Sequence, residues 1–194
     1  EYCLHGDISK YIQKLPGPVP VKLVNKWVAE LIMGVAHMHR VFIAHRDIKP
    51  ANVFLTRDLD VRLGDFGLGR LMVDPSQTYV GSPMYMSPEQ HQNKPYGLAG
   101  DIWALGCTIY EMCMKRPPFR CDTMEELHKK LEEGIIDPIP SDVYGTDLPR
   151  VVSMMLNKEP EDRPTAMGLL EDPWIKEQAG QVAIDILINK DRRM

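Results

Sequence analysis

The segment FIAHRDIKPANVFL, residues 42–55, places charged and polar groups between two short apolar runs. Five side chains suited to proton transfer, charge neutralisation or metal binding fall within eight positions: His45, Arg46, Asp47, Lys49 and Asn52. A second segment, LGDFGLG at 63–69, follows closely. Whether both segments belong to one site is the first question that the sequence raises.

The composition is that of an ordinary globular chain of 194 residues with a formal net charge of -4. A general nucleic-acid surface needs clustered Lys and Arg, so we expect none. No run of 18 apolar residues and no signal-peptide pattern occurs, so we expect no membrane span. The four cysteines form no C-x-x-C pair, which favours a reducing compartment. We therefore expect a cytoplasmic protein, with nuclear or cytoskeletal association left open.

Hydrophobic periodicity predicts an α+β fold that is mostly α. Apolar residues recur at helical spacing from Val21 to His39, and short β-rich runs (VFIAH, NVFL and DVRLG) predict a few small strands. The Pro- and Gly-rich region 70–100 is expected to be a long functional loop. Further helices are predicted at 101–113, 123–133, 147–157 and 165–171. The helix over 123–133 should begin with a capping box of Thr123 and Glu126 and stop at Gly134.

Five short motifs resemble, in order and spacing, those of eukaryotic protein kinases. They are HRDIKPAN (45–52), DFG (65–67), SPE (87–89), DIWALG (101–106) and EDRPT (161–165). Any one tripeptide would be weak evidence, whereas five in register are specific. The resemblance implies a kinase domain over 1–177 that contains the hinge and the large carboxy-terminal lobe, with a tail or extra helix over 178–194.

The resemblance implies that four residues carry phosphoryl transfer. Asp47 would accept or orient the proton of the substrate hydroxyl, and Lys49 would reach the transferred phosphoryl group. Asn52 and Asp65 would hold Mg²⁺ against the phosphates of ATP, because Mg²⁺ prefers a few hard oxygen ligands plus phosphate oxygens. A Lys two positions after the Asp is the pattern of serine/threonine kinases, so the implied substrate is a protein Ser or Thr.

The resemblance also implies a nucleotide-binding wall. EYC at the start of the chain resembles the hinge, where the backbone of Glu1 and Cys3 would bond the adenine edge. Asp7 would meet the ribose hydroxyls, and Phe54 would form the floor under the adenine ring. The open wall around Phe54 and the hinge is expected to expose an apolar patch that favours self-association or docking of another lobe.

Regulation is implied by Arg46, because kinases with Arg before the catalytic Asp are often switched by phosphorylation of the following loop. A phosphate adds about -1.5 to -2 charge and can clamp to Arg. The resemblance implies that Thr78 is the phosphosite of this loop. Ser82 stands where Thr is usual, and its hydroxyl is expected to bond Asp47 and Lys49.

Three further residues are implied to be structural. Glu89 and Arg163 should form a buried ion pair that ties the peptide-binding loop to the helical core, and Asp101 should support the DIWALG helix. His45 is expected to pack behind the site. The wording of EYC, HRDIKPANVFL, LGDFGLGR and YVGSPMYMSPE resembles the NIMA-related subfamily, although LHGDI and Ser82 depart from it.

No G-x-G-x-x-G or V-A-I-K motif occurs in the chain. The resemblance places these parts in an amino-terminal lobe, which we expect upstream of Glu1. Two alternatives remain open: the larger half of an active serine/threonine kinase, or a non-catalytic kinase-like lobe that binds partners as a scaffold. The sequence upstream of Glu1 would discriminate between them. By itself, this chain is expected to bind ATP with Mg²⁺ weakly and to be inactive.

Overall fold

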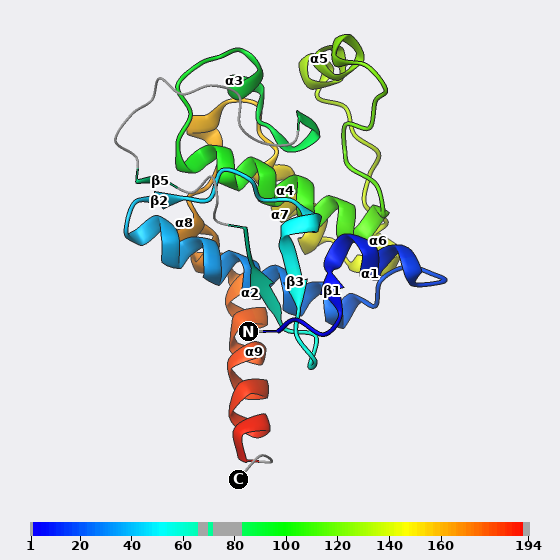
Figure 1. Ribbon diagram of the computed structural model, residues 1–194, viewed down its shortest axis with the longest axis vertical. Coiled ribbons are helices and arrows are strands. Elements are labelled where there is room, and N and C mark those ends of the chain that lie inside the picture. Colours follow the sequence, from blue (N-terminus) through cyan, green and yellow to red (C-terminus); the bar gives the residue numbers. More distant parts are fainter. Residues whose placement is uncertain (1, 66–69, 72–82, 192–194) are drawn as a thin grey trace.

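The computed structural model describes residues 2–65, 70–71 and 83–191. The described part is mostly helical, with short strands of two or three residues (Figure 1), so the predicted α+β class with a predominance of helix is confirmed. The elements are β1 (Gly6–Asp7), α1 (Ile8–Lys14), α2 (Val21–Arg40), β2 (Ile43–Ala44), η1 (Pro50–Asn52), β3 (Val53–Leu55), β4 (Val61–Leu63), β5 (Arg70–Leu71), η3 (Pro83–Tyr85), α3 (Pro88–His91), α4 (Leu98–Met114), α5 (Met124–Glu133), α6 (Ser141–Tyr144), α7 (Asp147–Met155), η4 (Pro160–Asp162), α8 (Ala166–Glu171) and α9 (Pro173–Asp191). None of the helices in this part is long and apolar enough to span a membrane.

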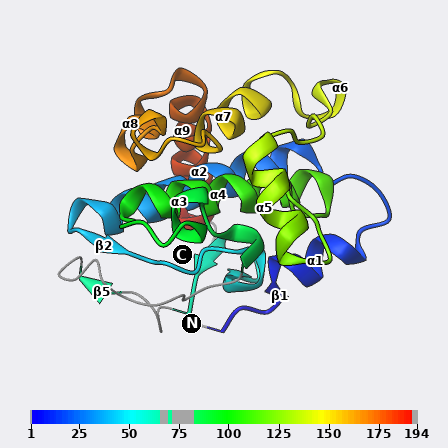
Figure 2. The same ribbon diagram turned by 90° about the horizontal axis from the view of Figure 1, so that it is seen from above.

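Two long helices, α2 and α4, form the centre of the molecule. Helix α2 buries Trp27, Leu31 and their neighbours at the predicted helical spacing, and it ends at Arg40. Helix α4 is buried on nearly all sides from Gly100 to Cys113, as expected for a helix that is apolar all round. In Figure 2 both helices lie between α7, α8 and α9 on one side and the short strands on the other.

The strands form two small antiparallel sheets. Strand β3 lies between β1 and β4, with Asp7 opposite Phe54 and Val53 opposite Leu63, whereas β2 pairs with β5. Strand β3 begins directly after Asn52, and β4 ends directly before Gly64. The sheet therefore places the end of the first motif beside the start of the second.

The prediction of a continuous loop over 70–100 was wrong in part, because β5, η3, α3 and the start of α4 lie there. Pro88 occupies the first turn of α3, where its missing N–H is not needed. The Gln90 side chain accepts a hydrogen bond from the Ser87 backbone N–H at 2.9 Å, which helps α3 to begin. Helix α4 begins at Leu98, three residues before the predicted start. In the described part of this region, Pro83 and Pro88 each begin a short helix.

The predicted ends of α5 are confirmed. The Thr123 hydroxyl accepts a hydrogen bond from the Glu126 backbone N–H at 3.2 Å, and Gly134 ends the helix with a positive φ of 66°. The Glu126 carboxylate accepts from the backbone N–H of Asp122, not from that of Thr123 as a capping box requires. The sequence thus located both helix ends but not the second capping partner.

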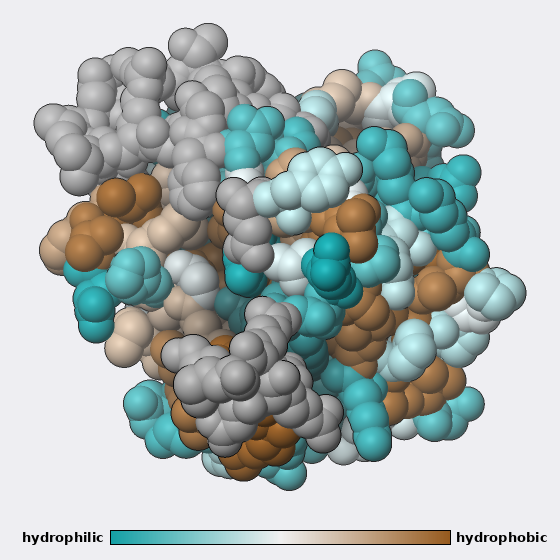
Figure 3. All heavy atoms as spheres, turned by 60° about the horizontal axis from the view of Figure 1, so that its bottom comes forward, coloured by the Kyte–Doolittle hydropathy of each residue, from teal (hydrophilic) through white to brown (hydrophobic). Residues whose placement is uncertain are grey.

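Helix α9 crosses the proposed domain boundary at 177 without interruption, and that boundary stays a prediction. Beyond Val182, which is buried, the helix exposes a group of large apolar side chains: Ile184, Ile186, Leu187 and Ile188. Figure 3, in which the lower end of the molecule comes forward, shows apolar surface near the end of α9.

Gly106 sits where α4 meets α7, and a Cβ atom there would lie 2.9 Å from Met155 Cβ and 3.0 Å from Leu156 Cδ2. We expect Gly106→Ala to destabilise the chain by about 1–3 kcal/mol, since overpacking outweighs the gain in helix propensity. Gly34 in α2 is the matched control because nothing lies within 4 Å of its added Cβ. Gly34→Ala should stabilise by about 0.5–1 kcal/mol. Urea unfolding midpoints measure both, and a neutral Gly106→Ala would contradict the packing described.

Candidate active site

The Asp47 carboxylate stands at the centre of a hydrogen-bonded cluster. Lys49 Nζ lies 2.7 Å from Asp47 Oδ2, and Asn52 Nδ2 donates to the same oxygen at 2.8 Å. Asn52 Nδ2 also donates to the backbone carbonyl of Asp47 at 2.8 Å. The structure therefore brings the three predicted catalytic residues together and fixes the orientation of the carboxylate, whose side chain is 10% exposed.

Asp101, on the first turn of α4, holds the backbone of this loop. Its Oδ1 accepts a hydrogen bond from the Arg46 N–H at 2.8 Å, and its Oδ2 accepts from the His45 N–H at 2.8 Å. Oδ2 also lies 2.9 Å from His39 Nε2, at the end of α2. Arg46 has a φ of 70°, a conformation that is uncommon for a non-glycine residue. The buried carboxylate thus stabilises the strained turn that leads into Asp47.

Two contacts join the loop that carries Asp47 to the second motif. His45 Nε2 lies 3.0 Å from the Gly64 carbonyl oxygen, and the Gly64 N–H donates to the Asn52 carbonyl at 2.9 Å. A Cβ atom on Gly64 would lie 2.8 Å from the Phe54 ring, so glycine permits this approach. Asp65 follows directly and is exposed. Both segments therefore meet at one site, and His45 links them in addition to packing behind them.

The oxygen atoms near this junction suit a hard cation. The Asn52 amide nitrogen is turned towards Asp47, which leaves the amide oxygen as the atom available to a metal. The Asp65 carboxylate is exposed one residue beyond the Gly64–Asn52 hydrogen bond. One amide oxygen and one carboxylate fit Mg²⁺ when phosphate oxygens complete its shell. Phe66 and Gly67, the rest of the DFG motif, lie outside the described residues.

The predicted nucleotide wall is described from residue 2 onwards, so Glu1 lies outside it. Cys3 and Phe54 are half-buried, and Phe54 pairs with Asp7 across the β1–β3 ladder. Asp7 also caps α1, because its Oδ1 accepts from the Lys10 N–H at 2.9 Å and its Oδ2 lies 2.8 Å from Lys10 Nζ. The sequence reasoning missed this cap, although an Asp before a helical run signals one.

Burial of the Asp7 carboxylate opposes its ionisation, but the hydrogen bonds and charge of Lys10 outweigh burial and lower the pKa of Asp7 below its ordinary value. Asp7 is therefore a carboxylate that already has partners on both oxygens. Its predicted contact with a ribose stays a prediction, as does the adenine floor at Phe54. At the predicted hinge the large exposed side chains are Tyr2 and Leu4.

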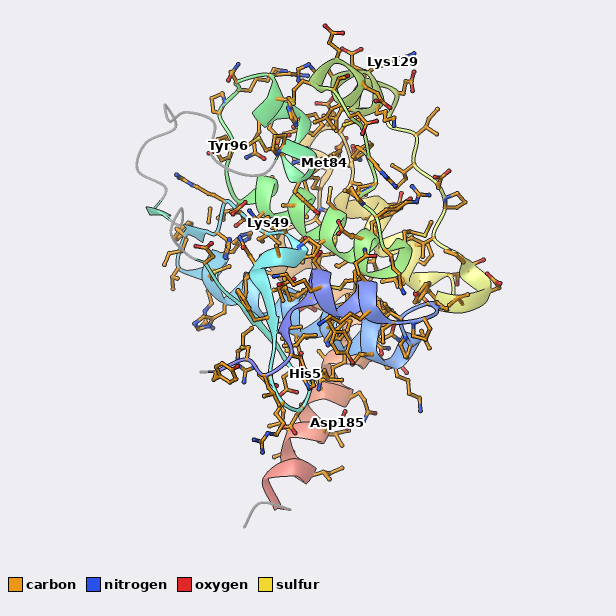
Figure 4. The ribbon with its side chains drawn as sticks, turned by 45° about the vertical axis from the view of Figure 1, so that its right-hand side comes forward. His5, Lys49, Met84, Tyr96, Lys129 and Asp185 are labelled. Carbon is orange, nitrogen blue, oxygen red and sulfur yellow. The ribbon has the colours of Figure 1, made fainter. Side chains whose placement is uncertain are left out.

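The regulatory predictions fall partly outside the described residues, where Thr78 and Ser82 lie. Arg46 is described, and its guanidinium carbon lies 5.9 Å from the centre of the Tyr96 ring. Lys49 and Tyr96 occupy the same part of the molecule in Figure 4, with Met84 near them and His5 and Asp185 far below.

Glu89 and Arg163, which the resemblance pairs, form a buried bidentate ion pair. Arg163 Nη1 lies 2.7 Å from Glu89 Oε1, and Nη2 lies 2.8 Å from Oε2. The remaining guanidinium donors reach the carbonyls of Asn157, Lys158 and Ala99. Burial alone would raise the pKa of Glu89, but the hydrogen bonds and charge of Arg163 hold that pKa below its ordinary value. The pair joins α3 to the segment after α7.

Sequence reasoning missed two buried contacts. His39 bonds Asp101 from 62 residues away, and the Tyr85 hydroxyl donates to Glu111 Oε2 at 2.7 Å from 26 residues away. Burial raises the pKa of the Glu111 carboxyl against the lowering effect of the Tyr85 hydrogen bond. No motif links His39 to Asp101 or Tyr85 to Glu111, so the sequence contained no signal for either pairing.

The site and the helical fold are those of a protein kinase domain. The family model described as protein kinase domain matches residues 1–175, and the chain belongs to this family. The membership that the five motifs predict is thereby confirmed.

Among curated relatives the chain is similar to serine/threonine-protein kinases of the Nek group. It is 41% identical over 174 residues to Nek3 of Mus musculus, covering 88% of this chain and 34% of that protein. It is 37% identical over 179 residues to Nek4 of Mus musculus (90% of this chain, 22% of that protein). It is 39% identical over 177 residues to Nek6 of Oryza sativa subsp. japonica (90% and 33%). The chain thus spans about a fifth to a third of the length of these relatives.

We expect Glu89→Gln to lower the free energy of unfolding by about 3–5 kcal/mol, because it leaves the Arg163 charge buried without a counter-charge. Glu161→Gln on the exposed surface is the control and should be nearly neutral. The pKa of Glu89 is lowered from 4.5, so the contribution of the pair should be present above pH 4.5 and lost as the pH falls through the folded pKa. Urea titrations at pH 7 and in acid measure both effects. Equal stability of the two variants at pH 7 would refute the role of the pair.

Proposed function

We propose that this chain is the large, carboxy-terminal lobe of a protein serine/threonine kinase that transfers the γ-phosphoryl group of ATP to a protein hydroxyl. The observation that carries the proposal is the Asp47–Lys49–Asn52 cluster, joined through Gly64 to Asp65. The names of the similar Nek proteins support this reaction class. The lobe assignment rests on the order of the motifs and on the predominance of helix.

In this proposal the residues of the cluster position and neutralise charge, which is most of what phosphoryl transfer needs. Asp47 orients the substrate hydroxyl and receives its proton while Asn52 and Lys49 hold the carboxylate in place. Lys49 also supplies a positive charge to the transferred group. Asn52 and Asp65 would hold Mg²⁺, which neutralises the phosphate oxygens when bound.

The proposal also includes a regulatory phosphorylation site and a firmly held segment that binds the substrate peptide. Thr78 is the proposed phosphosite and Arg46 the receiver of its charge, and mass spectrometry of the phosphorylated protein would locate the modified residue. The Glu89–Arg163 pair and the Tyr85–Glu111 hydrogen bond fasten the segment after the switch loop to the helical core.

Asp47→Asn should reduce phosphoryl transfer by at least about 10²-fold, since it removes the proton acceptor while preserving the shape of the side chain. The assay uses radiolabelled phosphate transfer in a longer protein that supplies the amino-terminal lobe implied by the family. Asp142→Asn, on the exposed first turn of α6, is the matched control and should retain parental activity. Near-parental activity of Asp47→Asn would exclude the proposed role of Asp47.

The 194-residue chain by itself should bind ATP with Mg²⁺ weakly and show no turnover, because no glycine-rich loop or V-A-I-K lysine occurs in it to neutralise the far side of the phosphates. Calorimetric titration of the chain with ATP and Mg²⁺ measures the affinity. Micromolar binding together with turnover would show that this lobe carries the whole nucleotide site.

A further inference from the structure

A cavity of about 410 Å³ opens between α2, the turn that joins β3 to β4, and α9. Ligand pockets in proteins measure about 300–1,000 Å³. The wall from α9 consists of Val182, Asp185 and Ile186, and Figure 4 labels Asp185 on the part of this helix that extends below the strands. These three residues lie beyond residue 175, where the match to the kinase family ends. Family membership therefore does not imply the complete cavity.

The lining of the cavity carries more negative than positive charge. It contains four carboxylates and two cations: Glu30, Asp58, Asp60 and Asp185, with Lys26 and Arg62. The Lys26 ammonium is engaged by the turn, since its Nζ lies 2.6 Å from Asp60 Oδ1 and donates to the Asp58 carbonyl at 3.2 Å. A ligand that enters the cavity meets a net negative charge, which favours a cation over an anion.

Glu30 is a buried carboxyl in this wall whose charge is poorly compensated. Its side chain is 10% exposed, and Oε1 lies 4.0 Å from Lys26 Nζ. Its Oε2 accepts a hydrogen bond from the Val61 N–H at 2.8 Å. Burial raises the pKa of Glu30 to about 7, against the lowering effects of the Val61 N–H, Lys26 and Arg62, and the charge of Asp60 adds to the rise. A ligand cation beside Glu30 favours its ionised form and gains affinity from the new pair.

Apolar side chains complete the cavity and continue beyond it along α9. Those in the lining are Met33, Val61, Val182 and Ile186. Further exposed ones on the same part of α9 are Ile184, Leu187 and Ile188. A compact ligand confined to the cavity leaves this second group in water, whereas a peptide that continues along α9 covers it. Charge and apolar surface together therefore fit a peptide that is both basic and aliphatic.

We propose that this groove, formed by the cavity and the exposed end of α9, binds a peptide segment of another protein in which a Lys or Arg lies close to aliphatic residues. The basic group lies against Glu30 and Asp185, and the aliphatic side chains pack on Met33 and Ile186. The inference does not depend on phosphoryl transfer, because an active kinase and a non-catalytic scaffold could both use such a groove.

The test begins with random dodecapeptides displayed on phage and selected on the immobilised 194-residue chain. Peptides that bind the parent but not Asp185→Lys should be enriched in Lys or Arg beside aliphatic residues. The most enriched peptide without His then serves as the probe in fluorescence polarisation. Enrichment without basic residues, or no peptide that distinguishes the parent from Asp185→Lys, overturns the proposal.

Asp185→Lys should weaken binding of the probe by about two- to thirtyfold, because an exposed attraction is replaced by a repulsion of similar size. Glu177→Lys is the matched control, since Glu177 is exposed on the same helix outside the lining, and it should bind the probe as the parent does. Urea midpoints show whether the variants remain folded. Equal affinities of the two folded variants would contradict the proposed site.

The pH dependence of probe binding tests the role of Glu30. The charged groups that line the cavity with Glu30 are Lys26 on its own helix, Asp58, Asp60 and Arg62 on the turn and β4, and Asp185 on α9. The pKa of Glu30 is about 7 without the probe, and the bound cation requires the ionised carboxylate. The affinity should therefore rise from pH 6 to pH 8 by up to about tenfold, and Glu30→Gln should remove this rise. An equal rise in Glu30→Gln would refute the placement of the basic group.

Sedimentation velocity of the parent and of Ile186→Asp decides whether a second copy of the chain occupies the groove instead. Equal sedimentation of the two proteins supports a peptide partner. A dimer in the parent that Ile186→Asp dissociates would make the groove an interface between copies and overturn the proposal.

Discussion

The carboxylate of Asp101 is the constraint on which the rest of the site depends. It lies inside the helical core, yet its two oxygens bind the backbone of His45 and Arg46 and the ring of His39. A residue in the left-handed region such as Arg46 is costly, and it persists where its surroundings over-determine it. Asp101 belongs to α4, which is buried on nearly all sides. Its hydrogen bonds therefore hold the turn before Asp47 rigidly against the core.

From this anchor the site extends by short hydrogen bonds. Asn52 and Lys49 orient the Asp47 carboxylate. The Asn52 carbonyl accepts a hydrogen bond from the Gly64 N–H, and this bond fixes the backbone directly before Asp65. The strands β3 and β4 are short, and they align only the ends of the two motifs. Helices α2 and α4 supply the buried apolar area. Stability therefore resides mainly in the α-helices, and the residues of the candidate active site lie in the segments between them.

Much of this arrangement could be predicted from the sequence, because its parts are contiguous motifs. The cluster at 45–52 and the ends of α5 are of this kind, whereas the pairing of Glu89 with Arg163, 74 positions apart, was implied only by the family resemblance. The contacts of His39 with Asp101, Tyr85 with Glu111 and Arg46 with Tyr96 were not predictable, since they depend on how segments far apart in the sequence pack together. The region 70–100 was misjudged in part because Pro83 and Pro88 begin helices, which composition alone does not distinguish from a loop.

The anchoring role of Asp101 is tested most directly by amide hydrogen exchange at His45 and Arg46 in the parent and in Asp101→Asn. The carboxamide that replaces the carboxylate in this variant can accept with one oxygen only, so one of the two backbone N–H groups loses its acceptor. We predict that these two amides exchange as slowly as the core of α4 in the parent. In the variant their exchange should quicken by more than the change in global stability accounts for. Equal protection of both amides in the two proteins, after correction for global stability, would contradict the account.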